Sequence, residues 1–174
     1  TRRYPGISVE FALFDWASAM DRIRTRRVDI AVVPDPTRQP DWYVRPIAQV
    51  RYVLYARGAH PLAHRTEVSL GELASETLLL PETGSLTQRV VSKARSDAEV
   101  QPRRLVTMTT FPVMKEAILQ GVGVGIFLEN SSVVDTQLCE IAIAEMDQVF
   151  TTCVVIPRHK LGLRITKSFL DVLN

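Results

Sequence analysis

The amino-acid sequence predicts an α/β protein of two lobes, with the second lobe inserted into the first. Short apolar runs alternate with helical patterns along the 174 residues, which is typical of sheets rich in parallel strands. Two such β/α clusters follow one another, and the chain then returns to extended segments and a closing amphipathic helix. We therefore expect residues 1–54 and 150–174 to form the first lobe and residues 55–149 to form the second. A cleft between two such lobes is where small ligands tend to bind.

The first lobe is expected to open with a strand over Ile7–Phe14, where apolar residues recur at every second position. Asp15 can cap the helix that follows, whose apolar face holds a residue set at helical spacing: Trp16, Ala19, Met20 and Ile23. A short, fully buried strand over Asp29–Val33 is expected to end at Pro34. The other expected elements are extended segments at Tyr43–Ala48, Arg51–Arg57 and Val149–Pro157 and a final helix with Ile165, Phe169, Val172 and Leu173.

The second lobe alternates short helices with strands. Capping boxes at Ser69-x-x-Glu72 and Ser85-x-x-Gln88 predict two helix starts, and the second of these helices is expected to run to about Ser96. A third helix begins near Pro112, where the missing proline N–H does no harm. Its apolar face is expected to hold Val113, Met114, Ala117 and Ile118. The expected strands are Thr77–Leu80, Leu105–Thr109, Val122–Leu128 and Leu138–Ile143.

Charge and composition argue against several classes of function. The 21 Lys and Arg residues against 19 Asp and Glu give a net charge of +2, whereas nucleic-acid modules usually concentrate a basic face. No run of roughly 18 apolar residues is present, so we expect no membrane span. Cys139 and Cys153 lack the spacing of a zinc site, so we expect reduced thiols, no metal and no cofactor. Because the sequence starts at Thr1 without Met, we expect it to be a piece of a longer protein.

The glycine-rich segment Gly121-x-Gly123-x-Gly125 is similar to a nucleotide-binding loop but lies at the wrong junction. The dinucleotide fingerprint follows a strand and opens a helix, whereas here a helix ends and a strand begins. We therefore expect a helix stop at Gly121 and tight packing at the other two glycines. With no nucleophile elbow and no paired carboxylates, the sequence disfavours an enzyme. The histidines are expected in surface loops: His60, His64 and His159.

Two segments carry a physical case for ligand binding. Thr83–Gln88 and Thr109–Pro112 each lie between a strand and a helix, which places hydroxyls and free N–H groups at a helix N-terminus. The helix macrodipole favours negative charge there, and open α/β sheets bind ligands at the carboxyl ends of their strands. Together the segments predict a site for a small anion or carboxylate. The alternative, that Ser85 and Thr110 merely cap their helices, stays open at this point.

Five short motifs follow one another along the whole chain. They are Arg3–Ile7, Arg26–Val32, Ala59–Ala63 with the following Leu70–Leu73, Val113–Phe127 and the closing Phe169–Leu170. In order and spacing this pattern resembles the effector-binding domain of LysR-type transcriptional regulators. The resemblance implies two Rossmann-like lobes in a periplasmic-binding-protein-like arrangement with a ligand cleft. It also implies that the chain senses a small effector, while DNA is bound by a helix-turn-helix outside this sequence.

The resemblance also implies the residues of the site. Family members use a hydroxyl at the position of Thr109 and a loop at Gly84–Ser85, and Pro34 takes the place of a Thr found in some sulfate-sensing members. The resemblance further implies a cytoplasmic homodimer or homotetramer. The full set of expected ligand-binding residues is Gly84, Ser85, Thr87, Thr109, Thr110, Phe111 and Pro34. The expected dimer residues, whose apolar members could equally serve the core, are Trp16, Met20, Ile23 and Arg27.

Two other functions remain as alternatives. A solute-binding protein of a transport system would have similar lobes but would be exported, and the sequence shows no secretory leader. An enzyme of the related two-lobed deaminase or dehydratase kinds comes third, because the sequence shows no catalytic cluster.

Overall fold

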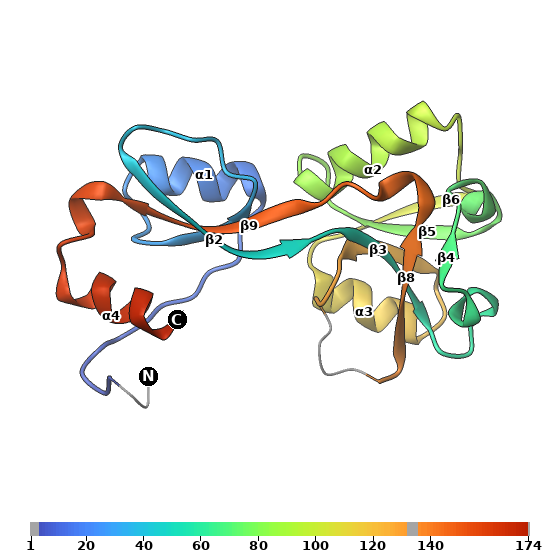
Figure 1. The fold of residues 1–174 in the computed structure, drawn as a ribbon. Coiled ribbons are helices and arrows are strands. Elements are labelled where there is room, and N and C mark those ends of the chain that lie inside the picture. Colours follow the sequence, from blue (N-terminus) through green and yellow to red (C-terminus); the bar gives the residue numbers. More distant parts are fainter. Residues whose placement is uncertain (1–3, 132–135, 174) are drawn as a thin grey trace. The chain divides into compact units, whose positions relative to one another are not determined.

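The computed structural model describes residues 4–131 and 136–173, so Arg3 of the first motif lies outside the described residues. Contacts divide the chain into two compact units, Thr1–Gln49 with Thr151–Asn174 and Val50–Phe150. Segments from both ends of the chain therefore share the first unit, as the blue and red parts of the ribbon in Figure 1 illustrate. The first division lies between residues 49 and 50 rather than between 54 and 55, so the whole strand that follows residue 51 belongs to the second unit.

The first unit is a three-stranded sheet with one helix packed into its core. The strands β1 (Ala31–Pro34), β9 (Phe150–Pro157) and β2 (Trp42–Val50) lie in the order β1-β9-β2, with β1 antiparallel to β9. Helix α1 (Trp16–Arg24) starts as predicted, because Asp15 accepts a hydrogen bond from the Ser18 N–H at 3.0 Å. Helix α4 (Arg164–Val172) follows a 3-10 turn at Arg158–Lys160. The core of this unit comprises Met20, Ile23, Ala31, Val33, Trp42 and Val155.

Two predictions for the first unit were wrong. Ile7–Phe14 forms no strand in the described structure, and Phe11 and Leu13 are 89% and 77% exposed. An alternating pattern yields a strand only where a neighbouring strand accepts its backbone hydrogen bonds, and the sheet of this unit consists of β1, β9 and β2. The strand predicted over Asp29–Val33 is displaced to Ala31–Pro34 and is not fully buried, since Val32 is 55% exposed. It lies at the edge of its sheet, with only one face turned to the core.

The second unit contains a six-stranded mixed sheet in the order β4-β8-β3-β7-β5-β6. Strand β5 is parallel to both β6 and β7, and β4 is parallel to β8, whereas β3 runs antiparallel to β7 and β8. The strands are β3 (Tyr52–Arg57), β4 (Glu67–Val68), β5 (Thr77–Pro81), β6 (Arg104–Met108), β7 (Val124–Leu128) and β8 (Leu138–Ile143). The helices are α2 (Leu86–Asp97) and α3 (Phe111–Leu119), with 3-10 turns at Pro61–His64, Gly71–Ser75 and Ala144–Met146.

Helices α2 and α3 cover opposite faces of this sheet, as Figure 1 shows. Leu78 and Leu80 of β5 belong to the core cluster that contains Val91 of α2. Leu79, which points the other way, belongs to the cluster of Met114 and Ile118 from α3. Val113 does not join this face as predicted: it is 50% exposed, because α3 packs through the stripe that Met114 and Ile118 form at a spacing of four residues.

The glycine-rich segment has the structural role that its position predicts. Gly121 follows the end of α3 with a φ of +76°, a conformation that favours glycine. A Cβ on Gly123 would lie 2.2 Å from the Thr77 carbonyl oxygen, and one on Gly125 would lie 2.7 Å from the Met114 Sδ. The interpretation of these residues as a helix stop and close-packed strand positions is confirmed.

The remaining local predictions were partly right. Ser69 and Glu72 make both hydrogen bonds of a capping box, at 2.9 and 3.3 Å, but they open a 3-10 turn rather than an α-helix. His60 is not a free surface residue: its Nδ1 accepts from the Leu62 N–H at 3.2 Å, and its Nε2 lies 3.4 Å from a Glu76 carboxylate oxygen. His64 and His159 are exposed as expected, and both cysteines are free thiols.

Candidate functional site

The two segments predicted to bind a ligand leave the sheet of the second unit at the same edge. Pro81 and Met108 are register partners at the ends of the parallel strands β5 and β6. Helix α2 begins five residues after the first of these ends and α3 begins three residues after the second. Strand β7 is parallel to β5, so its end at Leu128 points to this edge as well. We call this edge, with the described residues that follow β5, β6 and β7 (82–85, 109–110 and 129–131), the carboxyl edge.

The start of α2 is fixed by Ser85. Its Oγ accepts a hydrogen bond from the Gln88 N–H at 3.1 Å, which is the capping contact that the sequence predicts. Gly84 precedes it with a φ of +98°, and open space surrounds the position of a Cβ. Thr87 is only 6% exposed, and its hydroxyl donates to the Tyr52 hydroxyl at 3.3 Å. Thr87 therefore faces the interior of the unit, while Gly84 and Ser85 remain nearer the surface.

The start of α3 differs from that of α2. Thr110 occupies the N-cap position, but its side chain makes no capping hydrogen bond, and Pro112 has no N–H. Thr109 is exposed at the end of β6. Phe111 is half-buried, with its ring stacked on Phe127 at a centroid distance of 5.0 Å. Capping thus accounts for Ser85 but not for Thr110, whose hydroxyl is not used by its own helix.

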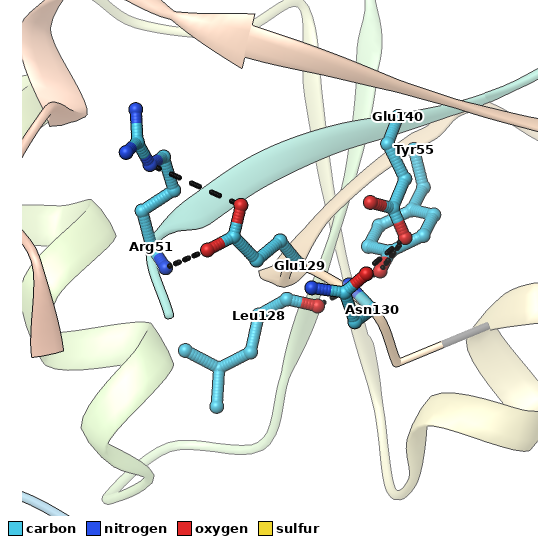
Figure 2. A network of polar contacts seen from close by, with 6 residues as sticks. All are labelled: Arg51, Tyr55, Leu128, Glu129, Asn130 and Glu140. Carbon is cyan, nitrogen blue, oxygen red and sulfur yellow. Dashed lines mark hydrogen bonds and ion pairs between the residues drawn. The ribbon is translucent and has the colours of Figure 1, made fainter. Parts of the chain in front are cut away.

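An ion pair at the end of β7 was not predicted from the sequence. Glu129 accepts a hydrogen bond from the Arg51 backbone N–H at 3.0 Å, and a second carboxylate oxygen lies 3.9 Å from the Arg51 Nε (Figure 2). The Glu129 N–H donates to the Arg51 carbonyl at 2.9 Å, which extends the pairing of β3 with β7 by one position. The carboxyl edge therefore carries a guanidinium group whose side chain is half exposed.

Tyr55 forms a second polar cluster near the end of β7 (Figure 2). The residue is fully buried, and its hydroxyl lies 2.8 Å from the Leu128 carbonyl oxygen and 2.7 Å from a Glu140 carboxylate oxygen. Burial raises the pKa of this hydroxyl above its ordinary value, and the hydrogen bond with Glu140 raises it further. The phenol therefore keeps its proton well above neutral pH and acts as a donor. Sequence patterns gave no signal for this contact, because Tyr55 and Glu140 are 85 residues apart.

The remaining predicted residues lie in the first unit. Pro34 ends β1, and its carbonyl oxygen accepts a hydrogen bond from the Trp16 Nε1–H at 2.9 Å. Met20 and Ile23 are 8% and 1% exposed, so their packing favours the core rather than a partner. Arg27 is exposed beyond the end of α1. A ligand contact at Pro34 and a dimer contact along α1 stay predictions.

The described residues also bear on whether the chain holds a metal ion or spans a membrane. They contain no group of three or more His, Cys, Asp or Glu side chains placed to hold a metal ion. Among them, no helix is long and apolar enough to cross a bilayer. A shallow hollow lies on the C-terminal half of α2, away from the carboxyl edge, and is lined by Ser92, Arg95, Ser96, Glu99 and Gln101. What the described part of the carboxyl edge offers an anionic group is hydroxyl groups and backbone N–H groups at helix N-termini, while the Arg51 guanidinium there is paired with the Glu129 carboxylate.

Comparison with known proteins shows which transcriptional regulators this chain resembles in sequence. The chain is 27% identical over 146 residues to the transcriptional regulator CfxR of Cupriavidus necator, an alignment that covers 84% of this chain and 46% of CfxR. It is 24% identical over 123 residues to the transcriptional regulator CysL of Bacillus subtilis, covering 71% of this chain and 41% of CysL. The matches thus span less than half the length of these two relatives.

A solved structure gives the same result for the fold. The regulatory domain of CcmR from Synechocystis PCC6803, in complex with 2-PG, superposes with a TM-score of 0.84 at 25% identity, covering 99% of this chain and 84% of that one. The predicted periplasmic-binding-protein-like fold is confirmed by this similarity. The family model described as the LysR substrate binding domain matches residues 1–174. The chain therefore belongs to the family of LysR substrate-binding domains.

Proposed function

We propose that this chain is the effector-sensing domain of a LysR-type transcriptional regulator and that its effector is a small anion. The observation that carries the proposal is the meeting of two helix N-termini at the carboxyl edge of one sheet. Thr109 is exposed there, and the Thr110 hydroxyl is not used to cap α3. Family membership supports the sensing role, and the similar CcmR domain, in complex with 2-PG, supports an anionic effector.

Sensing would work through a shift between conformations of the domain. A ligand that binds one conformation more tightly raises its population, and a change from 1:99 to 99:1 needs about a 10⁴-fold difference in affinity. The parts of the regulator that contact DNA would lie outside these 174 residues. The effector itself leaves unchanged, so the domain acts by binding and not by catalysis.

Location and assembly follow from the same role. We propose that the regulator works in the cytoplasm as a homodimer or homotetramer, with α1 and the residues just after it contributing to the contact between copies. Since Met20 and Ile23 are committed to the core, such a contact would use exposed positions such as Arg27. Sedimentation velocity of the Arg27→Glu variant tests this: a fall in the oligomer fraction supports the contact, and an unchanged distribution removes Arg27 from it.

A thermal-shift screen tests the proposed function. The panel would hold inorganic phosphate, sulfate, 2-PG and small mono- and dicarboxylates, with glucose as a neutral control. At a hundred-fold excess over Kd, binding adds about 2.7 kcal/mol to the free energy of unfolding. For a chain of this size that corresponds to a rise in Tm of roughly 5–10 °C. Stabilisation by an anion, with the compound recovered unchanged by NMR, supports the proposal; stabilisation by neutral sugars alone, or turnover of the compound, contradicts it.

A solute-binding protein of a transport system is the alternative function. A solute-binding protein would be exported, whereas a regulator would carry a DNA-binding segment in the same longer protein. The two curated relatives described above are transcriptional regulators, which favours the sensor.

A further inference from the structure

The turn that follows β7 is held by side chains from two other strands. Asn130 lies in this turn with a φ of +61°, in the left-handed region that a non-glycine residue adopts only at a cost. Its N–H donates to the Glu140 carboxylate oxygen at 3.0 Å. The next N–H, of Ser131, donates to the Tyr55 hydroxyl at 3.1 Å. The conformation of the turn therefore depends on Tyr55 from β3 and Glu140 from β8.

The Tyr55 hydroxyl both donates and accepts hydrogen bonds in this place. A phenol has one proton to donate and lone pairs that accept. The Tyr55 hydroxyl oxygen accepts a hydrogen bond from the Ser131 N–H. Its single proton is shared between the Leu128 carbonyl oxygen and a Glu140 carboxylate oxygen. The Leu128 carbonyl oxygen also accepts a hydrogen bond from the Ser131 hydroxyl at 2.6 Å. Removal of the phenol oxygen alone would leave the Ser131 N–H without its acceptor at the exit of β7.

The ring of Tyr55 reaches the other part of the carboxyl edge. It lies edge-on against the ring of Phe111 at a centroid distance of 5.1 Å and an interplanar angle of 62°. Phe111 is the first residue of α3 and follows Thr110 directly, and its opposite contact is the stack on Phe127 of β7. One buried side chain thus touches both the turn after β7 and the start of α3.

We infer that Tyr55 is a positioning residue for the effector site: its hydroxyl, with Glu140, fixes the turn after β7, and its ring supports Phe111 at the start of α3. The inference rests on the proposed function, because it assigns to Tyr55 the alignment of the edge that binds the anion. Tyr55 does not touch the ligand in this account. It acts by holding Phe111 and the Leu128–Ser131 turn in position. Pairing of the strands alone would hold the two less firmly.

Isothermal titration calorimetry with 2-PG, and with inorganic phosphate in parallel, tests the inference on the Tyr55→Phe variant. The variant keeps the ring and loses only the oxygen. We expect its Kd to rise about ten-fold, equivalent to the loss of about 1.4 kcal/mol of binding free energy. Glu140→Gln, which keeps an oxygen that can accept from Tyr55 and Asn130, is expected to retain affinity within about two-fold, since the acceptor rather than the charge is required.

Two controls separate positioning from loss of stability. Ile141→Val removes one buried methyl group from the neighbouring position of β8 and lowers the stability of the same unit, which a fall in Tm measures. Tyr43→Phe removes a phenol oxygen from the first unit. Both are expected to bind like the wild type. Amide exchange adds a readout without ligand: the Ser131 N–H should exchange faster in Tyr55→Phe and not in Ile141→Val.

The outcomes are distinguishable. If the wild-type domain binds and Tyr55→Phe binds equally well, or if Ile141→Val weakens binding as much, the inference is overturned while the proposed function stands. If the wild-type domain binds neither probe nor any other anion of the screen, the proposed function is overturned and the inference with it. Weaker binding by Tyr55→Phe alone, with faster exchange at Ser131, supports the positioning role.

Discussion

Pro81 and Met108 face each other as register partners at the ends of two parallel strands, and this single pairing brings the starts of α2 and α3 to one edge of the sheet. The positive ends of two helix dipoles therefore lie on neighbouring strands. Since α2 and α3 cover opposite faces of the sheet, the loops approach the edge from both sides. The arrangement leaves hydroxyls of Thr109 and Thr110 near N–H groups that have no partner within their helix.

Replacement of Thr109 should weaken effector binding. Thr109→Val keeps the shape of the side chain and removes the hydroxyl, so an anion bound there would lose one donor. We expect affinity to fall by roughly 1–3 kcal/mol, the usual cost of leaving a polar partner unpaired. Thr109→Ser, which retains the hydroxyl, serves as the matched control. Calorimetry showing equal affinity for all three proteins would remove Thr109 from the site.

Ser85 should contribute to stability through its cap. Ser85→Ala removes the acceptor of the Gln88 N–H and should lower the free energy of unfolding by about 1 kcal/mol. Ser96→Ala, an exposed position in the last turns of the same helix, should be neutral or slightly stabilising because alanine favours helix. Urea unfolding of both variants measures this, and equal midpoints would mean that the cap contributes nothing.

Gly123→Ala should destabilise the second unit severely. The new Cβ would lie 2.2 Å from the Thr77 carbonyl oxygen, and backbone atoms of two paired strands cannot move apart cheaply. We expect a loss of roughly 3 kcal/mol or more of unfolding free energy. Gly71→Ala adds a Cβ at an ordinary 3.6 Å from the Ser69 Oγ and should be tolerated. Thermal unfolding that ranks the two variants the other way would contradict the packing described for β7.

The stability of the first unit should depend on pH through Asp15. Its pKa is lowered, first by the hydrogen bond from the Ser18 hydroxyl and then by that from the Ser18 N–H. A carboxyl group with a lower pKa in the folded state stabilises the fold above its unfolded pKa, near the reference value of 3.8, and this contribution is lost as the pH falls through the folded value.

The Asp15→Asn variant isolates this effect. The amide can still cap α1 but does not titrate, so the wild type should be the more stable protein at pH 7 and should lose that advantage as the pH falls below 3.8 and through the lower folded pKa of Asp15. Ser18→Ala removes the larger of the two hydrogen-bond contributions and should shrink the advantage at pH 7. Urea unfolding across this range, with a constant difference between wild type and Asp15→Asn, would contradict the assignment.

What the sequence could predict is what depends on near neighbours in the chain. The caps at Asp15 and Ser85 and the helix stop at Gly121 each depend on residues within a few positions, and each was found as expected. Ile7–Phe14 failed because a strand needs a partner that local alternation does not supply.

For the site, the sequence located the two loops but not what supports them. Thr109 ends one predicted strand and Ser85 follows another, and that was sufficient to place them at a sheet edge. Tyr55 and Glu140 come from strands, and Arg51 directly precedes one, whose order in the sheet depends on long-range pairing. No periodicity distinguishes a tyrosine that packs in the core from one that also holds a turn 76 residues away.

The central claim, that an anion binds at the carboxyl edge of the second unit, is tested most directly by NMR mapping on the ¹⁵N-labelled domain during titration with 2-PG. The account predicts that the largest amide shifts fall on residues 84–86 and 109–111, saturating with a single Kd. Shifts centred on the hollow of Ser92, Arg95 and Gln101, or spread evenly over both units, would contradict it.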